Sequence, residues 1–200
     1  MPEHNYSPSE VTVGPVLEPI TVADVKDAAF IIDDSSYDLY ISKQLIPSAR
    51  RHVEELAVRS LITQTRAQYY DELRDIMWLT YGPVSAVTSV TYKDSDEASQ
   101  TLTASLYDLD NKREPARLVR GYNENYPTSI RDTNSVVVTM TCGYGLTYTS
   151  VPIIYRRACI MWAALELHNR VPIACADDYM KSLRALETLI SIEGRTRQYA

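Results

Sequence analysis

Two acidic clusters are the first candidates for chemistry in this chain. Asp71, Glu72 and Asp75 have the residue types of a general acid and base, but exposed acids on a turn are far commoner, and no histidine or cysteine is near them in the sequence. Asp94–Glu97 resembles part of a calcium loop, yet it lacks the central glycine and distal glutamate of the EF-hand. We interpret both clusters as turns.

The sulfur and imidazole side chains do not form a recognisable site either. The chain contains three cysteines and three histidines, at Cys142, Cys159, Cys175, His4, His52 and His168. Their spacing does not match structural zinc sites, and an odd cysteine count without a CxxC motif is typical of buried thiols in a reducing compartment. We therefore expect no metal and no cofactor.

Phosphate chemistry has two weak candidates, the pairs Arg50-Arg51 and Arg156-Arg157. The two residues of each pair point in different directions, which favours a solvated or subunit-facing role. No nucleotide-binding or hydrolase motif occurs, and six glycines make a phosphate-cradling loop hard to build. The sequence predicts that the chain is not an enzyme.

Charge and aromatic content narrow the class of protein. The net charge is −6, but residues 1–38 hold eight acids and one base, Lys26, so the remainder is close to neutral. This acidic segment is either a solvated tail or a surface that must not bind a polyanion. Fifteen tyrosines against one phenylalanine favour half-wet interfaces, as in an assembly subunit. With neither a secretory signal nor a membrane-length apolar run, we expect an intracellular protein that does not enter a membrane.

The hydrophobic period changes twice along the chain. Residues 1–19 are rich in proline and predict an extended arm. Thr21 and Asp24 resemble a capping box that opens a helix to about Ile31, and a second helix follows over Tyr37–Arg59. Pro47 predicts a kink or a break near Leu45 in that helix.

The middle of the chain has the two-residue period of strands. Val136, Val138, Met140 and Cys142 alternate with smaller or polar residues, which predicts one buried sheet face. The expected strands are Ile62–Tyr70, Ile76–Thr80, Val84–Lys93, Thr101–Tyr107, Arg117–Arg120 and Ser135–Cys142.

Helical periodicity returns after Pro152. We expect helices over Val151–Asn169, apolar enough around its circumference to pack on several sides, and over about Asp177–Ile192. The predicted fold class is α+β, with a helical core from about 20–60 and 151–193 and a β-rich insertion at about 61–149. Residues 20–193 then form a single domain between the arm at 1–19 and a C-terminal arm at 194–200.

Short sequence pieces in a constant order carry a family resemblance over about residues 18–170. They are Glu18–Val22, Val25-Lys26, Asp38–Arg50, Val53-Glu54, Arg59–Thr65, Gly82–Val84, Val87–Val90, Tyr92, Tyr107, Leu109-Asp110, Pro115–Leu118, Val136–Val138, Cys142–Gly145, Val151-Pro152, Ala158 and Asn169-Arg170. Together they resemble the head–tail connector (adaptor, or head-completion) proteins of tailed bacteriophages, prophages and gene-transfer particles.

The resemblance implies a structural virion protein in a twelve-membered ring beneath the portal. Such a ring extends the DNA channel without sequence-specific binding and docks the next neck or tail-completion protein. The chain would be found in the particle neck, and in the host cytoplasm during assembly. The family's C-terminal segment engages the portal, which assigns portal contacts here to Arg195, Arg197 and Tyr199.

Two other classes of protein stay open from the residues alone. One is an unrelated soluble α+β accessory subunit or small-ligand binding module. The other is a hydrolase that uses Asp71, Asp75 or Asp96.

Overall fold

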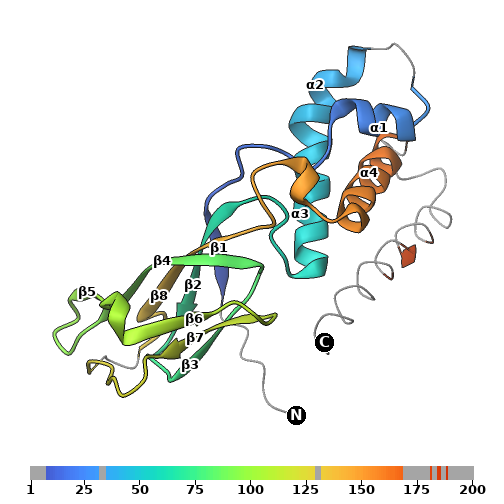
Figure 1. Ribbon diagram of the computed structural model, residues 1–200. Coiled ribbons are helices and arrows are strands. Elements are labelled where there is room, and N and C mark those ends of the chain that lie inside the picture. The colour runs from blue at the N-terminus through green and yellow to red at the C-terminus, as the bar shows by residue number, and fades with distance from the viewer. Residues whose placement is uncertain are drawn as a thin grey trace. The chain divides into compact units, whose positions relative to one another are not determined.

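The protein has an α+β fold, as the sequence predicts (Figure 1). The structure is a computed structural model that describes residues 8–31, 35–128 and 132–168, with the single positions 181, 184, 185 and 188. Contacts divide the chain into a β unit, Met1–Gly14 with Thr63–Gly143, and a helical unit, Pro15–Ile62 with Tyr144–Ala200. The helical unit therefore combines segments from before and after the β-rich residues 63–143, and the presence of helices and antiparallel sheets confirms the expected fold class, while the N-terminal segment belongs to the β unit.

The β unit contains a five-stranded antiparallel sheet in the order β1-β2-β8-β4-β5. Its strands are β1 (Ser9–Val13), β2 (Gln64–Tyr70), β4 (Val84–Lys93), β5 (Ser99–Thr101) and β8 (Val136–Cys142). The alternation predicted for β8 is confirmed, because Val136, Val138, Met140 and Cys142 are all buried. Residues 9–13 of the expected N-terminal arm are extended and pair with β2.

A second sheet closes the core of the β unit. It has three antiparallel strands in the order β3-β7-β6, namely β3 (Ile76–Leu79), β7 (Ala116–Arg120) and β6 (Tyr107–Asp110). Met77, Leu79 and Leu118 from this sheet share one buried cluster with Val138 and Met140 of β8. Each sheet has one apolar face, and these two faces pack against each other, which removes both from water.

The prediction of one continuous strand over Thr101–Tyr107 was wrong, because the middle of this segment is not a strand. β5 ends at Thr101, and Leu102 then enters the core while its N–H donates to the carbonyl of Val90 at 2.7 Å. A 3₁₀ turn, Ala104–Leu106, precedes β6 at Tyr107. This segment thus connects one sheet to the other, and Leu102 fills part of the core along the connection. Alternation of apolar and polar residues does not distinguish such a connection from a strand.

The helical unit begins with the capping box that the sequence predicts. In α1 (Val22–Ala28), Thr21 Oγ1 accepts from the N–H of Asp24 at 3.2 Å, and Asp24 Oδ2 accepts from the N–H of Thr21 at 2.8 Å. Both bonds satisfy backbone donors that the first helical turn leaves without partners.

The irregularity expected near Leu45 is a π-helical turn. A 3₁₀ turn (Ser35–Tyr37) leads into α2 (Asp38–Tyr40), the π turn Ile41–Leu45 and α3 (Ile46–Ala57). Pro47 has no N–H and its ring crowds the preceding turn, so the chain widens there, and the N–H of Ile46 donates to the carbonyl of Ile41. The helix changes its winding at the proline and continues.

After the 3₁₀ turn Tyr148–Ser150, α4 (Ile153–His168) packs against α1 and α3. The shared core includes Val25, Ile41, Val53, Tyr155 and Cys159. The helix expected over Asp177–Ile192 lies mostly outside the described residues, and the arm at 194–200 lies wholly outside them. The boundaries of the single domain 20–193 and its two arms stay a prediction.

Candidate functional site

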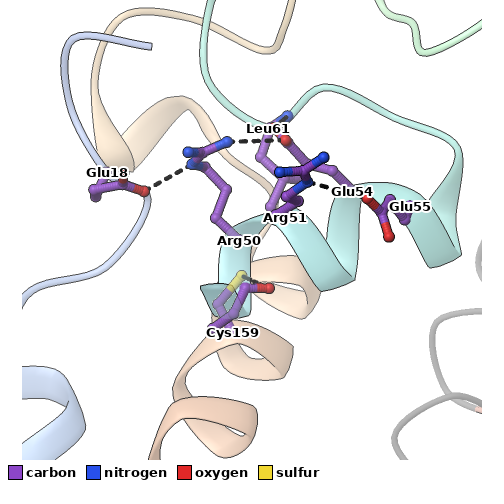
Figure 2. A network of polar contacts seen from close by, with 8 residues as sticks. Glu18, Arg50, Arg51, Glu54, Glu55, Leu61 and Cys159 are labelled. Atoms are coloured by element: carbon purple, nitrogen blue, oxygen red, sulfur yellow. Dashed lines mark hydrogen bonds and ion pairs between the residues drawn. The ribbon is translucent and has the colours of Figure 1, made fainter. Parts of the chain in front are cut away.

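A buried cluster of charges lies on α3 of the helical unit (Figure 2). Arg50 Nε is 2.8 Å from Glu18 Oε2, and Arg50 Nη1 is 3.0 Å from Glu54 Oε2. The second oxygen of Glu54, Oε1, accepts from the N–H of Leu61 at 2.8 Å. One guanidinium therefore joins the segment before α1 to α3, and one carboxylate joins α3 to the loop that follows it.

The electrostatics of this cluster suit a structural role. Burial by itself lowers the pKa of Arg50, but the hydrogen bonds and charges of Glu18 and Glu54 outweigh burial and raise it. The guanidinium is thus always charged, and both carboxylates are engaged by it. A general acid or base needs a proton that it can exchange near neutral pH, which this arrangement does not offer.

Cys159 lies beside the cluster and is not a nucleophile. Its Sγ contacts the carbonyl oxygen of Ala49 at 4.0 Å, and the side chain is fully buried (Figure 2). Burial strongly raises the pKa of the thiol, so the reactive thiolate is disfavoured at neutral pH. Cys142 is buried in the β unit, and Cys175 lies outside the described residues.

The acidic clusters of the middle segment are turns, as expected. Asp94 Oδ1 accepts from the N–H groups of Asp96 and Ala98 in the hairpin between β4 and β5, and Gln100 Nε2 donates to Oδ2. The bond from Gln100, with those from the two N–H groups, lowers the pKa of Asp94. Among the described residues, no three histidine, cysteine or acidic side chains form a group that could hold a metal ion.

Asp71, Glu72 and Asp75 also have local partners. Asp71 accepts from the N–H of Asn134 at 3.0 Å, while Glu72 and Asp75 pair with nearby arginines. The structure therefore does not bring them together as a catalytic pair.

Several acids of the N-terminal segment 1–38 form ion pairs or hydrogen bonds within the fold. Glu18 pairs with Arg50, Asp24 caps α1, and Asp38 pairs with Lys26 at 2.9 Å. In the β unit, Glu10 accepts a hydrogen bond from the hydroxyl of Tyr69. The sequence predicts the capping role of Asp24, but not the partners of Glu10, Glu18 and Asp38, because those partners lie farther away along the chain.

Exposed apolar side chains are the remaining candidates for function. The helix α4 packs on several sides, as expected, against α1, α3 and the π turn, but Ile153 and Met161 on one stripe are exposed. Phe30, Leu39 and Tyr40 are exposed at α1 and α2. On the β unit, Trp78 of β3 is half-exposed, and the guanidinium of Arg117 lies 6.0 Å from its ring centroid.

The C-terminal residues assigned to portal contacts, Arg195, Arg197 and Tyr199, lie outside the described residues. Their role stays a prediction. No helix in the described part of the chain has the length and apolar content to cross a membrane.

Three solved structures of gene transfer agent (GTA) particles contain chains of similar fold. No family model and no curated protein matches this sequence. A chain of the native GTA virion aligns with a TM-score of 0.72, covering 92% of this chain and 93% of that one. A chain in the neck of the empty particle, computed with C6 symmetry, has a TM-score of 0.66 with 82% and 85% covered. A chain in the native neck, computed with C12 symmetry, has a TM-score of 0.56 with 80% and 85% covered. Identity is 18% in each comparison, so these TM-scores establish a shared fold and nothing more specific.

Proposed function

We propose that this protein is a structural subunit of the neck of a tailed, phage-like particle. The single observation that carries the proposal is the fold shared with chains of GTA necks and virions over at least 80% of both partners. A fold can serve unrelated functions, so the sequence resemblance to head–tail connector proteins provides the second, separate support.

Within the neck, the chain is a connector: identical copies form a ring beneath the portal and dock the next neck or tail-completion protein. The symmetry of the neck structures, C6 and C12, supports a ring and is consistent with twelve copies. Packaged DNA passes through the channel of this ring without sequence-specific binding. The chain assembles in the host cytoplasm and ends in the particle.

The role is structural and not catalytic. The charges around Arg50 are paired, burial of Cys159 disfavours its reactive thiolate, and Asp94 of the β unit is engaged in a turn. These observations support a chain whose function lies in its surfaces.

Particles made with and without the chain test the proposal. We expect loss of the chain to yield filled heads that do not join tails, and a cryo-electron microscopy map of wild-type particles to place it between portal and tail. The proposed function would be contradicted if mass spectrometry detected no copy of the chain in purified wild-type particles, or if tails joined heads normally in its absence.

A further inference from the structure

The end of α1 has an unusual residue at a position that favours glycine. The N–H of Phe30 donates to the carbonyl of Asp27 at 3.2 Å, and the N–H of Ile31 donates to that of Lys26 at 3.0 Å. These two bonds define a Schellman cap, with Phe30 in the left-handed region at φ 54°. A bulky side chain is disfavoured in this conformation, so the backbone at Phe30 is strained.

Phe30 is also 89% exposed, and it is the single phenylalanine of the chain. Neither the cap nor the core needs its ring, since glycine would complete the same cap and the ring buries almost no surface. In the isolated subunit, the strained backbone at Phe30 lowers stability, and its exposed ring buries too little surface to offset this loss. Such outliers indicate function, and aromatic anchors are frequent at the centres of interfaces.

Phe30 belongs to an acidic face that also contains Asp27, Asp38, Leu39 and Tyr40. The ion pair between Lys26 and Asp38 ties the last turn of α1 to the first residue of α2, and Asp27, Leu39 and Tyr40 are exposed. Residues 22–40 contain five aspartates and one lysine. Among the described acids of this segment, Asp27 is exposed beside these apolar side chains, while Asp24 caps α1 and Asp38 pairs with Lys26.

A second face of the same helical unit has the opposite charge. Ile153, Arg157 and Met161 are spaced four residues apart on α4, which places them in one stripe, and all three are exposed. Arg156 lies with its guanidinium 4.9 Å from the ring centroid of Tyr148. Residues 143–165 contain these two arginines and no acid. We call the exposed stripe with Tyr148 the basic face.

We propose that the acidic face of one copy binds the basic face of the next copy. This inference rests on the proposed ring, because a closed ring of identical subunits needs two different surfaces that complement each other. The two faces match in both respects: each presents exposed apolar side chains, and their charges are opposite. The phenyl ring of Phe30 packs on the apolar stripe, and Asp27 pairs with Arg157 of the second copy.

The substitution Phe30→Gly separates this role from a structural one. Glycine suits the left-handed cap, so the melting temperature of the subunit should rise, while self-association measured by sedimentation should weaken about tenfold or more. The matched control is Tyr122→Ala, which removes another aromatic side chain, 98% exposed, from the β unit and should leave self-association unchanged. A Phe30→Gly chain that associates like the wild type would overturn the inference.

Exchange of charges tests the pairing of the two faces. Asp27→Lys and Arg157→Glu should each weaken self-association, and the double variant should restore most of it. Added salt should weaken wild-type association. A wild-type chain that stays monomeric throughout, or a double variant no better than the singles, would overturn this interface. Neither result bears on the neck role, which the particle assay decides separately.

Discussion

At the scale of single residues, Arg50 is the side chain whose loss should matter most to stability. Its own side chain is 14% exposed and that of Glu54 is 4% exposed, so removing the guanidinium leaves the buried carboxylate of Glu54 without this positive counter-charge. Breaking such a pair is strongly destabilising, although replacing a whole buried pair by apolar residues can be neutral.

We expect Arg50→Ala to lower the free energy of unfolding by about 3 kcal/mol in urea titrations. The neighbouring Arg51→Ala is a matched control, because Arg51 forms the same kind of i,i+4 pair, with Glu55 at 3.2 Å, but on the exposed side of α3. Its effect should stay below about 0.5 kcal/mol. Equal losses for the two variants would mean that burial of the Arg50 cluster contributes nothing.

Cys159 provides a second prediction at this scale. Since burial raises the pKa of its thiol, the reactive thiolate is disfavoured at pH values where a free cysteine begins to ionise. Native protein treated with iodoacetamide at about pH 8 should retain an unmodified Cys159 in peptide mapping, whereas protein in urea should be alkylated there. Rapid modification of the native chain would show that this part of the core opens readily.

At the scale of elements, α1 depends on its first and last turns. The helix has seven residues, too few to be stable by itself, so its caps and its packing on α4 must hold it. Thr21 satisfies backbone donors at the start, and the strained Phe30 cap closes the end.

Thr21→Ala should therefore destabilise the protein by about 1 kcal/mol in thermal or urea unfolding. Thr21→Ser is the control, because a serine hydroxyl can accept the same bond from the N–H of Asp24 and should keep most of the stability. A serine variant as unstable as the alanine variant would point to packing of the threonine methyl group instead of the cap.

At the scale of the whole molecule, the expected C-terminal arm is the segment to remove. Residues Arg195–Ala200 have no apolar periodicity in the sequence, and the family resemblance assigns them to portal binding. Deleting them should leave the melting temperature unchanged, because nothing in the segment can fill a core.

The same deletion should impair the joining of heads to tails, measured as the number of tailed particles after complementation. Replacing Arg195, Arg197 and Tyr199 by alanine at full length is the control for chain length and should give the same defect. Normal tail joining by both variants would exclude a portal contact in this segment.

The sequence by itself determined the features that depend on near neighbours. The capping box at Thr21 and the buried alternation of β8 follow from spacing along the chain, and both are confirmed. The change of hydrophobic period located the β insertion for the same reason. Pro47 indicated that the helix would be irregular, but the choice of a π turn over a break depends on what packs around it.

The tertiary structure decided everything that joins distant segments. Arg50 was a candidate for phosphate contact or solvent, and folding places it between Glu18 and Glu54 instead. Leu102 fitted the pattern of a strand, yet it lies at a crossing between two sheets. The exposure of Phe30, Ile153 and Met161 also cannot be predicted from the pattern of apolar residues. An apolar side chain favours burial, but its type does not determine whether the same chain or another chain covers it.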